Sequence, residues 1–179
     1  MKKILYTGVI ALLLSVAAKA QINEKYTFVF KLHEQTRRYE VNITEQKDTL
    51  LFEWGTLRNS LWQKGIYKMG YQNVEEGDGL SWLQPVDGCE AVLPVNETFG
   101  IISRKALKSL KDKAWFVYNG TIYRKIVDES SDKQEFKGKK LIHVLADVDQ
   151  TNMWIVDNEA LPLIYKLSDN PLGIDWSVE

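Results

Sequence analysis

The sequence LIHVLADVDQTNMWIVDNEALPLIYKL, residues 141–167, carries the clearest secondary-structure signal in this chain. Three apolar runs, Leu141–Val148, Met153–Val156 and Leu161–Leu167, are separated by two short clusters rich in Asp and Asn. Connections this short leave no room for a crossover helix, so the sequence predicts an antiparallel meander. Neither alternate set of side chains is polar throughout, which is typical of strands that are covered on both faces.

Alternating apolar residues predict a second meander nearer the N-terminus. Lys25–Leu32, Tyr39–Ile43 and Leu50–Trp54 each place apolar side chains at every second position. Asn119-Gly120 predicts a hairpin with a type I′ turn, because both residue types tolerate positive φ. A final short run, Ile174–Val178, completes about eight to ten expected strands.

Ser103–Asp112 is the clearest helix signal. Ser103 suits the N-cap, and Leu107 and Leu110 belong to a narrow apolar stripe among basic residues. A helix of this length is marginal alone and must pack on another element. The sequence therefore predicts one mainly β domain of the α+β class, residues 21–179. Its curved antiparallel sheet, a half-barrel or barrel-like one, carries one short helix.

Arg58–Asp87 is the least regular segment by composition. Gly65, Gly70, Gly77 and Gly79 interrupt its apolar residues, which predicts loops rather than regular structure. Within it, Ser81–Pro85 fits a short edge strand, since proline is tolerated at sheet edges. Loops held by a rigid sheet often carry binding residues, so this segment is a candidate for function.

Residues 1–20 have the pattern of a cleaved secretory signal. Lys2 and Lys3 precede an apolar stretch, and Ala18 and Ala20 supply small residues before the cleavage site. No second apolar stretch is long enough to span a bilayer, so we expect an exported bacterial protein, periplasmic or extracellular, without a transmembrane segment. The alternative interpretation of residues 1–20 is a membrane anchor.

Composition excludes some functions. The chain has 23 basic and 24 acidic residues in mixed order, which gives no electrostatic footprint for nucleic acid. Cys89 is the only cysteine, so an internal disulfide is excluded, and a small buried hydrophobe is its expected role. The oligomeric state is left open.

No catalytic, metal or cofactor site is predicted. His33 and His143 lie in strand patterns without metal-site spacing, and pairing of either with Cys89 rests on residue type alone. Asp147-x-Asp149-x-Thr151 is similar to a calcium loop, but it lacks the central Gly and distal Glu and fits an ordinary turn. A hydrolase acting on envelope polymers is therefore a third alternative only.

Aromatic residues are the candidate ligand-binding residues. The chain has six tryptophans, and most are expected in the core. Trp62 and Trp82 flank the Gly-rich segment, where they could line a cleft, although a core role is the competing interpretation. The full candidate set is Trp62, Trp82, Tyr67, Trp154 and Tyr165.

From residue 65 onward the chain resembles a group of uncharacterised exported bacterial β-rich proteins. The shared features are GIYKMGY, Pro85–Gly88, ETFGIISRKALKSLKD, WFVYNG and MWIVDNEALPLIYKL. The closing pattern is also similar to periplasmic half-barrel proteins, lipoprotein carriers among them, whose concave sheet holds acyl chains. Those carriers have several covering helices, whereas this chain has one convincing helix, so lipid carriage is an analogy from the fold.

These observations favour a non-enzymatic envelope protein. Its concave sheet face is expected to bind an apolar ligand, such as a lipid, or a lipidated partner. The alternative is an interaction or structural module that docks on another envelope protein through the same face.

Overall fold

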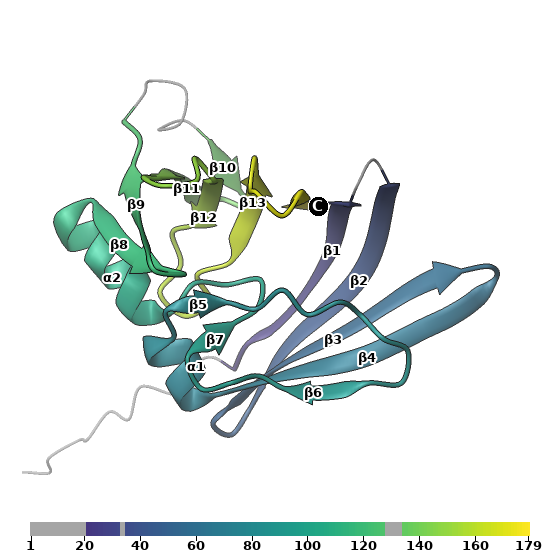
Figure 1. Ribbon diagram of the computed structural model, residues 1–179. Coiled ribbons are helices and arrows are strands. Elements are labelled where there is room, and N and C mark those ends of the chain that lie inside the picture. The colour runs from purple at the N-terminus through teal and green to yellow at the C-terminus, as the bar shows by residue number, and fades with distance from the viewer. Residues whose placement is uncertain (1–20, 33–34, 128–133) are drawn as a thin grey trace, which may run out of the picture.

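The computed structural model describes residues 21–32, 35–127 and 134–179 of the chain. These residues form a mainly β structure with fourteen strands and two helices (Figure 1). The predicted export signal, residues 1–20, lies outside them. None of the helices they form has the length and apolar character needed to cross a bilayer.

The strands differ widely in length along the chain. They are β1 (Asn23–Leu32), β2 (Gln35–Gln46), β3 (Thr49–Arg58), β4 (Leu61–Gly70), β5 (Gly79–Leu80), β6 (Glu90–Val92), β7 (Glu97–Thr98), β8 (Trp115–Tyr118), β9 (Thr121–Lys125), β10 (Glu135–Phe136), β11 (Lys139–Ala146), β12 (Asn152–Val156), β13 (Ile164–Ser168) and β14 (Ile174–Val178). The helices are α1 (Tyr71–Glu76) and α2 (Arg104–Lys113).

Twelve strands form one curved sheet. Its order is β6-β4-β3-β2-β1-β14-β13-β12-β11-β9-β8, with β10 paired to β11. Neighbouring strands are antiparallel except β4 and β6, which are parallel. They are parallel because residues 77–89 return the chain toward the start of β4 before β6 begins. The predicted curved, mainly β sheet with a short helix is confirmed. The sheet is mixed rather than wholly antiparallel, and it has more strands than expected.

The predicted C-terminal meander is confirmed. Strands β11, β12, β13 and β14 lie side by side in chain order, with Met153 opposite both Val144 and Leu167. These three side chains are almost fully buried on the concave face. The outer face is covered in part. Leu141 and Val156 are buried there.

The N-terminal strands extend further than the sequence predicts. Strand β4 contradicts the expectation of an irregular segment after Arg58, because it pairs with β3 along its whole length. Gly65 fits this strand for a specific reason: a Cβ there would lie 2.5 Å from the Trp54 ring, which occupies that space. Tyr71–Glu76 is helical, and the expected Ser81–Pro85 edge strand is absent. Strand β6 occupies that edge instead.

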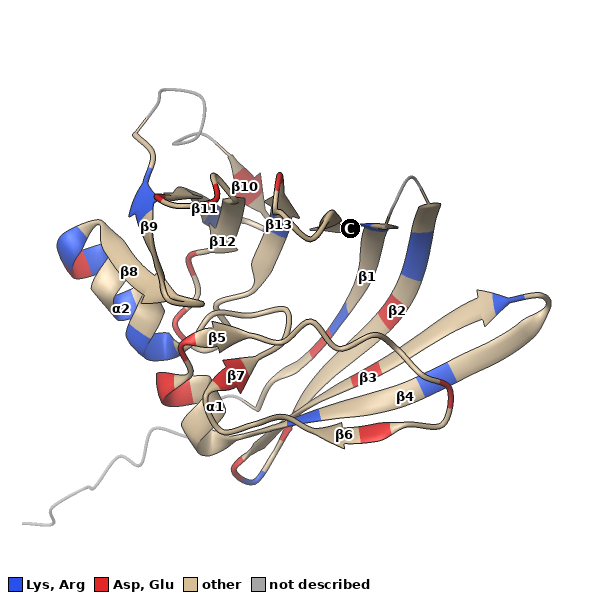
Figure 2. Cartoon of the chain, viewed as in Figure 1, with Lys and Arg blue, Asp and Glu red and all other residues tan. Residues whose placement is uncertain are grey.

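Helix α2 packs on the sheet as predicted. The Ser103 side chain caps the helix by accepting a hydrogen bond from the Ala106 N–H at 3.3 Å. Leu107 and Leu110 are buried, while the basic residues of α2 lie along its exposed side (Figure 2). With residues 99–102, which are also buried, the helix fills much of the space over the concave face.

The β8–β9 hairpin has the predicted turn. Asn119 and Gly120 have φ values of 51° and 73°. The Asn119 side chain also accepts a hydrogen bond from the Leu80 N–H at 2.7 Å, which joins the hairpin to β5.

Candidate ligand-binding site

The two N-terminal hairpins separate at their outer ends. Within each hairpin the strands stay paired, β1 with β2 as far as Gln35 and β3 with β4 as far as Arg58. Pairing between β2 and β3, in contrast, stops at Glu40 and Gly55. Twist accumulates along long strands, so two hairpins that continue beyond the packed core diverge.

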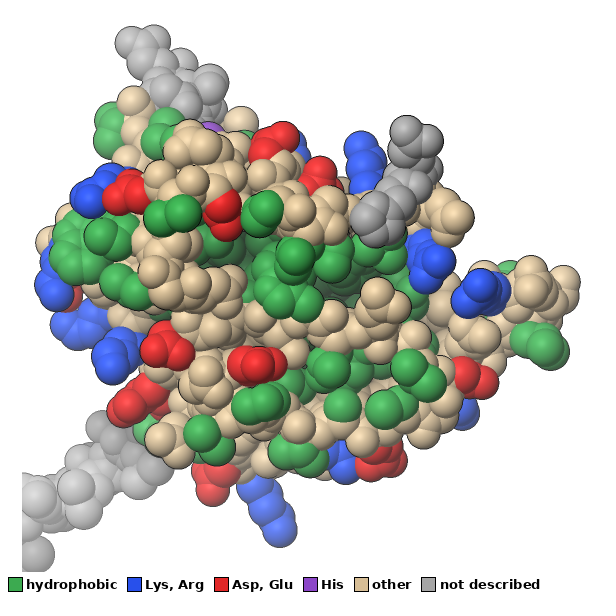
Figure 3. All heavy atoms as spheres, in the orientation of Figure 1, with side chains coloured by type: hydrophobic (Ala, Val, Ile, Leu, Met, Phe, Trp, Pro, Cys, Tyr) green, Lys and Arg blue, Asp and Glu red, His purple; other side chains and the backbone are tan. Residues whose placement is uncertain are grey.

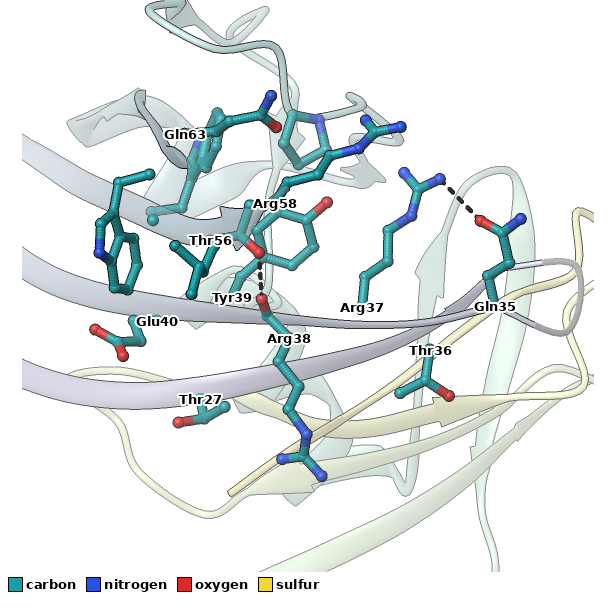
Figure 4. A pocket seen from close by; sticks show the side chains of 15 residues that line it. Thr27, Gln35, Thr36, Arg37, Arg38, Tyr39, Glu40, Thr56, Arg58 and Gln63 are labelled. Atoms are coloured by element: carbon teal, nitrogen blue, oxygen red, sulfur yellow. Dashed lines mark hydrogen bonds between the residues drawn. The ribbon is translucent and has the colours of Figure 1, made fainter. Parts of the chain in front are cut away.

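An opening of about 760 Å³ lies in this divergence, and we call it the hairpin opening. It is lined by Thr27, residues 35–40 and 54–58, Trp62, Gln63 and Pro85. At its base the Thr56 hydroxyl donates a hydrogen bond to the Arg38 carbonyl at 2.7 Å (Figure 4). This side-chain bond takes the place of a backbone pair, and beyond it no β2–β3 hydrogen bond joins the described residues.

Tyr39 and Trp54 form the buried wall of the hairpin opening. Both lie on the concave face, and their rings meet edge to face with centroids 5.9 Å apart. Tyr39 is only 6% exposed, but its hydroxyl is accessible at the opening and has no hydrogen-bond partner within the described ranges. In Figure 4 this hydroxyl points toward Arg58.

Three arginines line the hairpin opening from two sides. Arg37 and Arg58 extend from the concave side, and their guanidinium groups point toward one another (Figure 4). Arg38 extends from the opposite side of β2 and pairs with Glu179 at 2.5 Å. Arg37 contacts the Gln35 side-chain oxygen at 3.1 Å. The concave side of the opening is therefore cationic.

An apolar groove adjoins the hairpin opening. Tyr39 and Pro85 line both spaces, so the two are continuous. The groove holds only about 30 Å³, roughly the space of one water molecule. Its lining is almost wholly apolar and comprises Phe30, Leu32, Tyr39, residues 81–85, Phe99, Ile174 and Trp176. In Figure 3 hydrophobic side chains gather in the hollow between the two parts of the sheet.

Two of the five predicted ligand-binding residues lie at this site. Trp62 lines the hairpin opening from the outer face and is 58% exposed. Trp82 lines the apolar groove, where its ring centroid is 6.2 Å from that of Trp176. The structure thus brings Trp62 and Trp82 to neighbouring spaces that share Pro85.

Tyr67 belongs to the core and lines neither space. It is 1% exposed, and its ring centroid lies 4.8 Å from that of Phe99. Burial raises the pKa of the Tyr67 hydroxyl well above its usual range.

Trp154 and Tyr165 lie on the C-terminal strands, apart from the other candidates. Trp154 stacks on His143 with ring centroids 4.2 Å apart, and Lys166 lies over its ring at 4.4 Å. Tyr165 occupies the β12–β13 bulge and contacts Phe136 at 4.9 Å. Neither residue lines the hairpin opening or the groove.

The candidate chemical groups do not converge in the described residues. Cys89 lies beside β4 near one edge of the sheet, and His143 lies on β11 near the other. His33 falls outside the described residues. Within residues 21–32, 35–127 and 134–179, no three His, Cys, Asp or Glu side chains are grouped closely enough to hold a metal ion. Asp149 accepts the Thr151 N–H at 3.0 Å, as the turn interpretation predicts.

The sequence interpretation did not identify Arg37, Arg58 and Tyr39 as site residues. Arg37 lies outside the strands expected at Lys25–Leu32 and Tyr39–Ile43 but inside the observed β2, and Tyr39 was assigned only to the apolar side of a strand. The signal for these residues that the sequence did contain is the run Arg37-Arg38-Tyr39. In a strand, Arg37 and Arg38 point to opposite faces, so Arg37 lies on the same face as Tyr39. Arg58 could not be added to them without knowing where β2 and β3 diverge.

Comparisons of this chain with protein-family models, curated proteins and solved structures give no match.

Proposed function

We propose that this protein is a non-enzymatic bacterial envelope protein that binds an apolar ligand, or a lipidated partner, at the hairpin opening. The observation that supports the proposal is an opening of about 760 Å³ that continues into an apolar groove. Small-molecule sites typically occupy about 300–1,000 Å³ and combine apolar walls with a few polar groups. The lining of the opening itself is largely polar, and the adjoining groove supplies the apolar walls.

The proposed ligand lies at the end of the sheet rather than deep inside it. Beneath the groove the concave face is filled by its own side chains, including Phe28, Phe52 and Ile101, which are fully buried. An apolar chain in the opening would therefore extend along Tyr39 toward Trp82. Entry into the groove requires movement of residues 82–85, which no strand pairing holds in place.

A protein partner is the second candidate, and the strand edges favour it. Beyond Glu40 and Gly55, the edges of β2 and β3 that face the hairpin opening lack strand partners among the described residues. Such edges can accept an added strand from another chain. An extended segment of an envelope protein is the partner that this geometry suits.

Binding of Nile red, a neutral apolar dye, tests the leading proposal. We expect wild-type protein to bind the dye and shift its emission to the blue. Gln63→Trp fills part of the hairpin opening without breaking a hydrogen bond found among the described residues, and it should weaken binding roughly tenfold. Val117→Trp, at the opposite end of the sheet, is the control and should bind like wild type.

Two further measurements separate the candidates. Native mass spectrometry of the protein from its natural envelope should show a co-purifying lipid or lipidated partner. Light scattering should show a monomer if the opening binds a small ligand, whereas a stable dimer that Gln63→Trp disrupts would favour docking. Absence of dye binding and of co-purifying lipid would contradict the ligand proposal.

A further inference from the structure

We propose that Arg37, Arg58 and Tyr39 form an oxyanion-binding site, and that the ligand is an amphiphile with a carboxylate or phosphate headgroup. The inference deepens the proposed function and rests on it, because it assigns the headgroup of the same ligand. The headgroup would lie in the hairpin opening, and the apolar part would extend past Tyr39 and Pro85 toward the groove.

Strand register places the two arginines on one face. Arg37 pairs with Phe30, whose side chain lies on the concave face. Arg58 is an even number of residues from Trp54 along β3, so it points to the same face. The guanidinium groups consequently approach each other across the opening, as Figure 4 shows. Two planar groups of this kind are suited to the oxygens of a carboxylate or phosphate.

No carboxylate of the described residues neutralises this pair. Glu40 is the only acidic residue among those lining the opening, and strand alternation puts it on the face of Arg38 rather than Arg37. Arg38 is neutralised by Glu179, whereas Arg37 and Arg58 form no ion pair within the described ranges. Like charges that converge without a counterion among the described residues favour binding of an anion between them.

Tyr39 supplies a third donor at the same place. The residue is 6% exposed, and its hydroxyl has no hydrogen-bond partner in the described part of the chain. The hydroxyl itself remains accessible at the hairpin opening, so its O–H can donate to a bound oxyanion. Because Tyr39 lines both spaces, an oxyanion bound to its hydroxyl would direct the attached apolar chain along the ring toward the groove.

The test compares amphiphiles that share a tail and differ in headgroup. Isothermal titration calorimetry of the full mature chain would use decanoate, decyl phosphate and 1-decanol, each below its aggregation concentration, with inorganic phosphate as a tail-free probe. Wild-type protein should bind at least one of the two anions about tenfold or more tighter than decanol. Stronger binding of decanoate or of decyl phosphate identifies the headgroup.

Three variants and a matched control locate the effect. Arg37→Gln and Arg58→Gln should each reduce anion affinity about tenfold and leave decanol binding unchanged, and Tyr39→Phe should reduce it about threefold to tenfold. Arg38→Gln removes the same charge from the adjacent residue, which points away from the pair, and should change anion affinity less than about twofold. Far-UV circular dichroism checks that each variant is folded.

The outcomes separate this inference from the proposed function. Equal affinity for decanol and both anions, or an equal loss in Arg38→Gln, overturns the oxyanion site while apolar binding stands. Binding of inorganic phosphate that depends on Arg37 and Arg58, without binding of Nile red or decanol, supports the oxyanion site and contradicts the apolar-ligand proposal. Absence of binding by every probe overturns both.

Discussion

The two halves of the large sheet differ in how far their strands extend beyond the packed core. In the C-terminal half, β12, β13 and β14 have five residues each, and α2 packs nearby against β8. In the N-terminal half, β1 to β4 have ten to twelve residues each. A strand rises about 3.3 Å per residue, so the longer strands span roughly twice the distance. Their outer ends have no helix to pack against in the described residues.

This difference in length accounts for the position of the candidate site. Where the strands are no longer than the layer that covers them, side chains fill the concave face, as Val144 and Met153 do. Where they continue beyond it, the hairpins diverge, and residues such as Leu57, Leu61 and Trp62 stay exposed. A ligand surface arises where strand length exceeds the covering layer. The following predictions test that contrast.

The largest effect is expected from α2. Leu107 is 1% exposed under the helix, and Leu107→Ala should lower the free energy of unfolding by about 3 kcal/mol through lost burial and a cavity. Leu57→Ala, at the β3–β4 tip where Leu57 is 60% exposed, should lower it by less than about 0.5 kcal/mol. Urea unfolding measures both. Similar losses in the two variants would show that the tip is packed and would break the contrast.

A glycine pair marks where packing ends within the N-terminal half. A Cβ at Gly65 would lie 2.6 Å from the Cys89 carbonyl oxygen and still closer to the Trp54 ring, so Gly65→Ala should destabilise by about 2 kcal/mol. At Gly55 the nearest atom would be 3.5 Å away, an ordinary contact. Gly55→Ala should therefore be close to neutral in the same unfolding assay. If Gly65→Ala left the free energy of unfolding unchanged, the tightly packed part of the N-terminal half would end before Gly65.

The Tyr123 hydroxyl reports on the packed half through pH. Burial raises its pKa from 10.0 to about 12. Between these values the unfolded state has lost the proton and the folded state retains it, so the free energy of unfolding falls as pH rises from about 10 to about 12. The expected loss is on the order of 1–2 kcal/mol and is absent below pH 10.

Urea unfolding at a series of alkaline pH values measures this slope. Tyr123→Phe should reduce it, whereas Tyr71→Phe, at a residue that is 60% exposed, serves as the matched control. A slope that is the same in wild type and Tyr123→Phe would mean that other tyrosines carry the effect.

The smallest effect is expected from the ion pair that joins the two halves. Arg38 on β2 pairs with Glu179 after β14, but the side chains are 60% and 56% exposed. Arg38→Gln should therefore cost less than about 1 kcal/mol, and the difference from wild type should vanish in 1 M NaCl. A larger, salt-independent loss would indicate that this pair restrains the hairpins relative to the C-terminal half.

Local patterns predicted the elements whose partners are close in sequence. The C-terminal meander, the Asn119-Gly120 turn and the Ser103 cap all depend on neighbouring residues, and each is confirmed. Strand β4 was missed because Gly65 reads as a loop residue until Trp54 is placed over it. The contact that explains this glycine is between the Trp54 ring on β3 and the Gly65 backbone on β4, and the alternation of apolar residues does not describe it.

The candidate site shows the same limit. Trp62 and Trp82 were chosen as candidates because they flank a glycine-rich segment, whereas Tyr67, from the same segment, lies in the core. Arg37, Arg58 and Tyr39 carry no motif that links them. Their common feature is a position beyond the end of β2–β3 pairing.

The sequence by itself determined a mainly β chain with one capped amphipathic helix, because hydrophobic period, turn residues and capping act over a few residues. Tertiary structure decided the order of the strands, the parallel return of β6 and the place where β2 and β3 part. These features depend on twist accumulated over whole strands and on which side chains fill the concave face. Arg37 and Arg58 are therefore remote residues in the sequence and neighbours across the hairpin opening in the folded protein.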